Sequence, residues 1–188
     1  SQKFTIDTLW TDKISIRAIQ LWDGKVWYAG TDSKFGYVDL ENVNNKKQIR
    51  LSQKSLQFRT LAQNNKYFYA INIESPAYFF QVDKKTLDSK VVFNDNDPTA
   101  FYDALKFTDR NFGLAFSDPS ANQRLNISQT RNGGANWINC KNCKDFPYLE
   151  KGEAAFAASN TNIASFRNVI WIATGGAKSR IYRMKNKD

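Results

Sequence analysis

The chain has 188 residues, of which 41% are hydrophobic, 14% aromatic and 24% charged, a composition that excludes disordered and collagen-like proteins. The formal net charge of +9 favours an anionic partner, but the Lys and Arg residues are spread along the chain and form no basic arm of the kind that binds nucleic acid. The absence of histidine removes the commonest general base and metal ligand, which counts against catalysis and against a metal site.

Strand signals dominate from the N-terminal end onward. Short runs rich in aromatic and β-branched residues alternate with Asn, Asp, Gly and Lys clusters, and no apolar run approaches the roughly 20 residues of a membrane-spanning helix. In the first unit, about 14–51, the pair Asp23-Gly24 predicts a tight hairpin turn. The strands predicted in this unit are Ser15 to Leu21, Lys25 to Ala29, Phe35 to Leu40 and Lys47 to Leu51.

The second unit, about 56–93, repeats this plan 42 residues later, with Arg59-Thr60-Leu61 at the place of Arg17-Ala18-Ile19. The third unit, about 101–139, has Asp103 at this place, and the fourth, about 153–188, has Glu153. The further strands predicted are Leu56 to Ala62, Tyr67 to Ile73, Ala77 to Val82, Lys90 to Phe93, a strand around Asp103, Asn111 to Ala115, Gln123 to Gln129, Glu153 to Ala158, Val169 to Ala173 and Ser179 to Met184.

A repeat of about forty residues built from short strands predicts an all-β fold, a β-propeller with four-stranded antiparallel blades. We expect residues 1–188 to form one propeller region of about four blades, belonging to a larger ring of six to eight. An open ring leaves strand edges and apolar blade faces unpaired, so we expect such a fragment to self-associate through its first or fourth unit.

A motif of turn residues closes the third strand of the third unit. In it, Thr130, Asn132, Gly134 and Trp137 fit the Asp-box of BNR-type propellers, with Thr for Ser and Asn for Asp. A short polar side chain accepts backbone hydrogen bonds, Gly supplies a positive φ, and Trp fills the space beneath the turn. The motif therefore indicates a blade corner and carries no catalytic role.

A second resemblance covers about 101–183. The segments 102–113, 117–119, 152–163 and 174–180 resemble a family of bacterial secreted propellers, some named oxidoreductases, which are similar to the photosystem II assembly propellers of plants and cyanobacteria. The resemblance implies a binding scaffold outside the cytoplasm, with its signal peptide removed. The oxidoreductase name has no support, since no GxGxxG lies between a strand and a helix, and we expect no cofactor.

The candidate binding residues fall in two groups. Arg17, Arg59, Asp103 and Glu153 are predicted on the innermost strands, where they line the channel mouth; alternatively, arginine and carboxylate pair across adjacent blades. Loops between strands hold the other candidates, which are Asp118, Lys178 and Arg180.

The chain's two cysteines form a CxxC pair, Cys140 and Cys143. A small loop-closing disulfide in an extracytoplasmic protein is the favoured interpretation. Free thiols, or a metal or redox role, are the alternatives; neither a helix that lowers a thiol pKa nor a second ligand pair is evident.

Two functions fit these observations. The first is a non-enzymatic, secreted or periplasmic propeller that binds a protein or other anionic macromolecule, including a glycan; it predicts no tight cluster of buried carboxylates with shifted pKa values. The alternative is a sialidase-like glycoside hydrolase or lyase acting on an anionic glycan, which requires three converging arginines, here Arg17, Arg59 and Arg180, and a Tyr-Glu pair.

Overall fold

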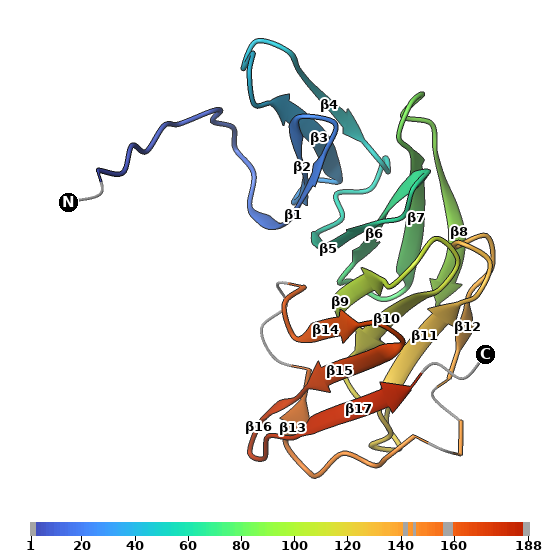
Figure 1. Cartoon of the computed structure of the whole chain (residues 1–188). Helices are drawn as coiled ribbons and strands as arrows, with labels where there is room; N and C mark the ends of the chain where they lie inside the picture. Colours follow the sequence, from blue (N-terminus) through green and yellow to red (C-terminus); the bar gives the residue numbers. More distant parts are fainter. Residues whose placement is uncertain (1–2, 141–142, 145, 156–159, 186–188) are drawn as a thin grey trace.

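A computed structural model describes residues 3–140, 143–144, 146–155 and 160–185. Over this part of the chain the regular elements are β-strands and there is no helix (Figure 1). Three consecutive antiparallel sheets contain four strands each, paired in chain order, and a fourth group of strands follows them. The all-β prediction of four-stranded antiparallel blades is therefore confirmed for the first three units.

The first blade contains β1 (Ile16–Trp22), β2 (Lys25–Gly30), β3 (Lys34–Asp39) and β4 (Lys46–Arg50). The predicted hairpin turn between β1 and β2 is present, with a φ of 52° at Asp23 and 65° at Gly24. Both values lie in the left-handed region that a tight two-residue hairpin requires. Residues 3–15 precede β1 without regular structure (Figure 1), and the later part of this segment lies against the first blade, where Trp10 stacks on Tyr28 and Asp12 pairs with Lys34 at 2.6 Å.

The second blade contains β5 (Phe58–Gln63), β6 (Tyr67–Asn72), β7 (Ala77–Asp83) and β8 (Ser89–Asp95). The third contains β9 (Tyr102–Phe107), β10 (Gly113–Ser117), β11 (Asn126–Thr130) and the short β12 (Ile138–Asn139). The innermost strands β1, β5 and β9 lie side by side, with β5 in contact with both of its neighbours. The blades are thus arranged around one axis, as the propeller prediction requires.

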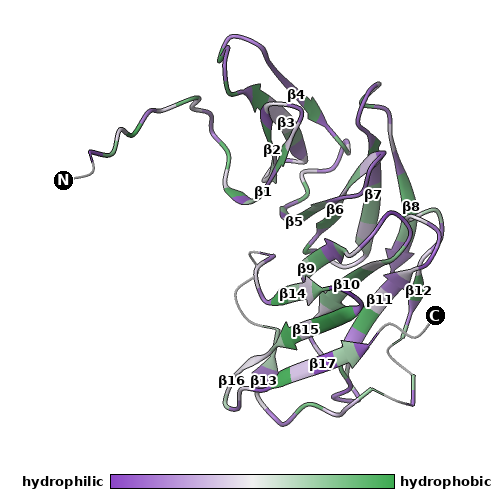
Figure 2. Cartoon of the chain, viewed as in Figure 1, coloured by the Kyte–Doolittle hydropathy of each residue, from purple (hydrophilic) through white to green (hydrophobic). Residues whose placement is uncertain are grey.

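Alternate residues of each central strand pack on opposite neighbours. Along β6, Phe68 and Ala70 join a buried cluster shared with the first blade, whereas Tyr69 and Ile71 join one shared with the third. A third cluster, which includes Phe116 and Ile127, joins the third blade to the fourth. Because each fully buried large apolar side chain contributes about 1.5–3 kcal/mol, these layers between blades dominate the stability of the fold. Figure 2 shows the hydrophobic residues concentrated in the strands.

The fourth blade departs from the sequence prediction. Glu153 to Ala158 was expected as one innermost strand, but β13 ends at Ala154, and residues 156–159 lie outside the described part. The innermost position is resumed by β14 (Ile163–Phe166), which the sequence prediction missed. The remaining strands are β15 (Val169–Ala173), β16 (Gly175–Gly176) and β17 (Ile181–Lys185). β13 pairs with β16 and β14 with β15, so the described part of this blade has two short strands in place of the one that was expected.

Asn160, which precedes β14, contacts the inner strands of two other blades. Its side-chain Oδ1 accepts a hydrogen bond from the Leu105 N–H at 2.6 Å, and its Nδ2 donates to the Leu61 carbonyl at 3.1 Å. One amide side chain therefore joins the backbones of β9 and β5. Without Asn160, these two backbone groups would lose that partner.

The terminal blades expose apolar side chains. Ile19 and Leu21 of β1 are 57% and 66% exposed, and Ile181 of β17 is 77% exposed. Self-association through the first or fourth unit stays a prediction, for which these side chains are the relevant surface.

Candidate functional site

The sequence placed Arg17, Arg59 and Asp103 at matching points of three innermost strands, and the structure puts them on β1, β5 and β9. Their surroundings differ. Arg17 is exposed, and Arg59 is half-buried with its guanidinium carbon 5.7 Å from the centre of the Phe101 ring. Asp103 is buried, with 2% of its surface exposed. The arginines are therefore the accessible members of this group.

Asp103 lies against a second candidate, Asp118, which follows the end of β10. Burial, reinforced by the neighbouring Asp118 carboxylate, raises the pKa of Asp103 to about 8, against the opposing effect of Arg59. Burial also raises the pKa of Asp118, although its Oδ1 accepts a hydrogen bond from the Ala155 N–H at 3.0 Å. Asp103 is therefore neutral at pH 7.

This pair corrects the expectation that the protein has no cluster of buried carboxylates with shifted pKa values. The Oδ2 atom of Asp103 is buried and has no hydrogen-bond partner among the described residues. A carboxyl group that holds its proton avoids the cost of a buried charge, which is why this environment is tolerated. The sequence contained no signal for it, because Asp103 and Asp118 are brought together by the pairing of β9 with β10.

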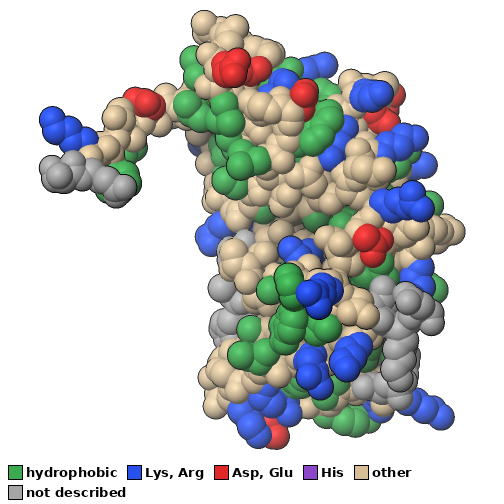
Figure 3. Space-filling view, viewed as in Figure 1, with side chains coloured by type: hydrophobic (Ala, Val, Ile, Leu, Met, Phe, Trp, Pro, Cys, Tyr) green, Lys and Arg blue, Asp and Glu red, His purple; other side chains and the backbone are tan. Residues whose placement is uncertain are grey.

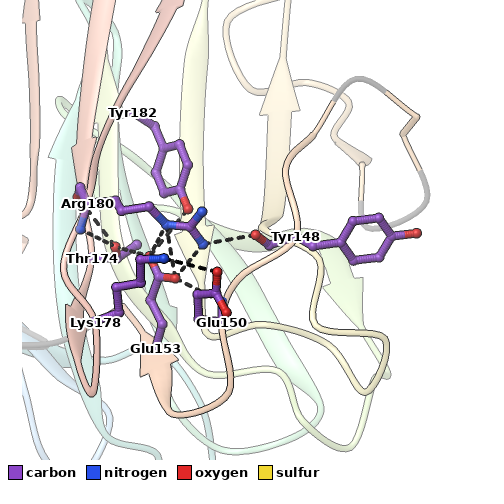
Figure 4. Close-up of polar contacts among 7 residues, drawn as sticks. All are labelled: Tyr148, Glu150, Glu153, Thr174, Lys178, Arg180 and Tyr182. Atoms are coloured by element: carbon purple, nitrogen blue, oxygen red, sulfur yellow. Dashed lines mark hydrogen bonds and ion pairs between the residues drawn. The ribbon is translucent and has the colours of Figure 1, made fainter.

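Glu153, the fourth predicted channel residue, belongs to a different cluster inside the fourth blade (Figure 4). The Arg180 guanidinium donates to its carboxylate from Nε at 3.0 Å and from Nη2 at 2.5 Å. The hydroxyls of Thr174 and Tyr182 donate to the same carboxylate at 2.5 and 3.3 Å. The side chain of Glu153 has no exposed surface. It is thus satisfied internally.

The electrostatics of this cluster fit a structural role. Hydrogen bonds from Arg180 hold the pKa of Glu153 down to about 2, and burial raises the pKa of Tyr182 to about 12. Arg180 also donates to the Tyr148 carbonyl at 2.9 Å, and Lys178 pairs with Glu150 at 3.0 Å on the surface. The alternative that arginine and carboxylate satisfy one another describes Glu153 and Arg180, but the pair lies within one blade instead of between two.

The residues of the turn between Thr130 and Trp137 lie as their turn chemistry predicts. The Thr130 hydroxyl oxygen accepts a hydrogen bond from the Gly134 N–H at 2.9 Å, and Asn132 Oδ1 accepts one from the Asn136 N–H at 2.9 Å. Gly134 has a φ of 85°. Trp137 is buried, and its ring centre lies 5.0 Å from that of Phe79 in the second blade. The motif therefore joins a blade corner to the neighbouring blade.

Cys140 and Cys143 are free thiols in the structure, which differs from the disulfide that the sequence favoured. Cys140 is buried, and its carbonyl accepts a hydrogen bond from the Cys143 N–H at 2.9 Å, so the chain turns tightly here. Burial, with the Cys143 thiol adjacent, raises the pKa of Cys140 to about 12. A thiol with such a pKa has very little thiolate at pH 7, so it is a poor nucleophile.

Sequence reasoning missed two further features. Asn160 bridges β5 and β9; it lies in the resembling segment 152–163 but was not identified as a candidate residue. Lys84 was not among the candidate residues, yet it is 6% exposed and lies in a cleft between the first two blades. A lysine in a turn is ordinarily solvated, so its burial depends on the neighbouring blade and not on local sequence.

Neither a protein-family model nor a curated protein matches the sequence. Several solved structures, however, are similar to the chain. The chain is similar to the computationally designed Ika4 protein, with a TM-score of 0.57, 11% identity, and coverage of 98% of this chain and 99% of that chain. It is also similar to the RRP9 WD40 repeats, with a TM-score of 0.59 and 11% identity over 94% of this chain and 52% of that chain.

A third similar structure is YCF48 bound to D1 peptide, with a TM-score of 0.54 and 11% identity over 87% of this chain and 52% of that chain. The chain spans about half the length of these two natural proteins and nearly all of the designed one. These likenesses show the fold alone, and the fold is a β-propeller. No helix among the described residues is long and apolar enough to cross a membrane.

Proposed function

We propose that this chain is a non-enzymatic binding module, part of an extracytoplasmic β-propeller of the BNR or Asp-box type, that holds a protein partner at its channel mouth. One observation carries the proposal. Arg17 and Arg59 reach the surface at the same end of adjacent innermost strands, and over the described residues neither forms an ion pair. Such guanidinium groups are ready donors for the carboxylates of a partner.

The similar structures support a protein partner. YCF48 was solved with a D1 peptide bound, so a propeller of this general shape can hold a peptide. The RRP9 match is to WD40 repeats, another propeller type. Because the chain spans about half of those proteins, the partner and the complete ring remain part of the proposal.

The geometry does not favour the sialidase-like alternative. Of the three arginines that it requires, Arg180 is held by Glu153 and the Tyr148 carbonyl, whereas Arg59 lies over Phe101. These two guanidinium groups contact no common residue. The only candidate Tyr-Glu pair in the described part is Tyr182 with Glu153, and there the tyrosine pKa is raised to about 12, opposite to what a nucleophilic phenolate needs.

A capture experiment tests the proposal. The immobilised chain is exposed to the extracytoplasmic fraction of its source cells, in parallel with the R17A/R59A double variant and a matched R131A/R167A double variant, whose arginines are exposed elsewhere. We expect a protein that the wild type and R131A/R167A retain and R17A/R59A loses. Equal retention by all three contradicts the proposal, as does turnover of an anionic glycan that is abolished by D103N.

A further inference from the structure

A cleft of about 560 Å³ lies between the first and second blades, at the end of the innermost strands opposite to Arg17 and Arg59. The β1–β2 turn, β3 and β4 form one side, and the β7–β8 turn forms the other. Its volume falls within the range of ligand-binding clefts. Figure 3 shows Lys and Arg side chains spread over the whole visible face, the upper part of the molecule included. The charged residues of the lining are Lys25, Lys47, Lys84, Lys85 and Asp23.

Lys84 lies at the back of this cleft. Its ammonium group is 4.8 Å from the centre of the Trp22 ring and 5.0 Å from that of Phe68, and it donates one hydrogen bond, to Gln63 Oε1 at 2.6 Å. No carboxylate pairs with it among the described residues. Two of its three N–H donors are therefore left without a protein acceptor, although the residue is only 6% exposed.

An almost buried ammonium without a counter-ion is costly, and the lowered pKa of Lys84, about 8, reflects its burial. The cation–π contacts offset part of this cost. An anion entering the cleft would provide the missing charge and accept the free N–H groups. Charged interactions of this kind gain strength where solvent is excluded.

The other lysines of the cleft differ in how far they are neutralised. Lys25 is paired with Asp23 at 3.0 Å and lies 4.0 Å from Asp39. Lys47 and Lys85 are exposed at the rim, and neither forms an ion pair within the described part of the chain. Together with Lys84, they provide three ammonium groups around one cleft that form no ion pair among the described residues, although the backbone N–H of Lys85 and, less strongly, its charge do lower the pKa of the neighbouring Asp83.

The aromatic rings of the cleft indicate the kind of anion. The Lys84 ammonium lies over the Trp22 ring, and the Lys25 ammonium lies 5.7 Å from the centre of the Tyr37 ring. Two of the three lining rings thus already have a cation on one face, and the third, Trp27, is only 2% exposed, whereas a sugar needs an open aromatic face for stacking. A flexible Asp or Glu side chain can bind through the ammonium groups alone, without an open aromatic face. This contrast favours a peptide over a glycan.

We propose that this cleft between the first two blades binds an acidic peptide segment of the partner protein, with Lys84 holding a carboxylate at the back and Lys47 and Lys85 contacting further carboxylates at the rim. The inference rests on the proposed binding function and adds to it the chemistry of the partner. It places this contact at the opposite end of the innermost strands from Arg17 and Arg59.

The test measures binding of a fluorescently labelled hexaglutamate peptide by anisotropy at low salt. The variants are K84M, K47Q/K85Q and the control K46Q, which removes a charge from the same strand as Lys47 but outside the cleft. We expect K84M and K47Q/K85Q each to weaken binding at least tenfold and K46Q to change it less than twofold. Hexalysine should not bind, and trigalacturonate should compete weakly.

Any of the following results overturns the proposal. If the wild type does not bind hexaglutamate, or if K84M binds it as tightly as K46Q does, the cleft is not the site. If trigalacturonate binds more tightly than the peptide, the site is for an acidic sugar. Methionine replaces the buried ammonium by an apolar group of similar length, so K84M should melt no lower than wild type, and its melting curve verifies folding.

The capture experiment separates the two proposals. If R17A/R59A loses the partner while K84M retains both the partner and hexaglutamate, the cleft proposal is wrong and the binding function stands. If no variant affects capture, the binding function at the channel mouth is wrong whatever the peptide result.

Discussion

Glu153 and Arg180 form an ion pair inside the fourth blade, with Arg180 Nη2 2.5 Å from Glu153 Oε2. The pair links β13 to the start of β17, and it also holds the preceding loop through the hydrogen bond from Arg180 to the Tyr148 carbonyl. Both residues were candidates for partner binding by sequence. Their mutual contact shows instead how β13 of this blade is fixed in place.

Removing the charge of Glu153 is expected to destabilise the fold. In E153Q the Arg180 guanidinium loses its counter-ion and a buried acceptor is replaced by an amide, so we expect a loss of about 3 kcal/mol in the free energy of unfolding. Urea denaturation of wild type and E153Q measures this loss. The control is E150Q, which breaks an exposed pair with Lys178 and should cost less than about 1 kcal/mol. Equal effects of the two variants would contradict the structural role.

Because the pKa of Asp103 is raised, we expect the free energy of unfolding to fall as the pH rises. Its folded-state pKa of about 8 lies above the value of about 4 in an unfolded chain, so the folded protein binds more protons between these two pH values. The contribution of Asp103 to the free energy of unfolding is fully present below pH 4 and is lost as the pH rises to 8. D103N cannot ionise, so we expect it to remove this slope and to be more stable than wild type at pH 8.

The measurement is the free energy of unfolding of both proteins in urea at pH 5, 6, 7 and 8. D118N is the informative companion, because the Asp118 carboxylate is one cause of the raised pKa of Asp103 and its removal should reduce the slope. Parallel pH profiles for wild type and D103N would show that Asp103 has an ordinary pKa.

Because the pKa of Lys84 is lowered, we expect its contribution to the free energy of unfolding to rise with pH above neutrality. Its folded-state pKa of about 8 lies below the unfolded value of about 10.4, so the unfolded chain binds more protons between these pH values and stability rises there. K84M should lack this rise, and it should exceed the wild-type stability most clearly at pH 7. Unfolding in urea at pH 7, 8.5 and 10 tests this, with K46Q expected to follow the wild-type profile.

Features determined by local chemistry were predictable from the sequence, and features determined by contacts between blades were not. The Asp23-Gly24 turn and the repeat of Arg17 at Arg59 follow from residue type and spacing alone, and both lie as expected. In the last blade, Asn160 bonds backbone groups at Leu61 and Leu105 in two other blades. No local pattern reveals a hydrogen bond between residues so distant along the chain.

The candidate site residues differ in the same way: their strand positions follow from the sequence, and their surroundings depend on contacts between strands and blades. Spacing placed Arg17, Arg59 and Asp103 on matching strands, but their exposure depends on what packs beside each, and Asp103 is buried against Asp118. Glu153 and Arg180 were both identified, although not as partners of one another. The lysine cleft was invisible to sequence because it forms only when two blades meet.

The Asp-box glycine gives a prediction with a matched control in the same chain. Gly134 has a φ of 85°, and a Cβ added there would lie 2.3 Å from the Tyr69 hydroxyl, which itself hydrogen-bonds the Gly133 carbonyl. Gly24 has a φ of 65°, but a Cβ there meets nothing within 4 Å. Both G134A and G24A bear the cost of about 1–2 kcal/mol for a left-handed residue, and only G134A adds a clash.

We therefore expect G24A to lower the free energy of unfolding by about 1 kcal/mol and G134A by about 3 kcal/mol or more. The Tyr69 ring is fixed between Phe107 and Trp137, so it has little room to move away from the added methyl group. The double variant Y69F/G134A removes only the hydroxyl, whereas the ring atoms Cζ and Cε1 would still lie 2.4 and 2.5 Å from the added Cβ, so it should recover little of the loss. Equal costs for the two single variants would show that the Asp-box turn is not held against the second blade.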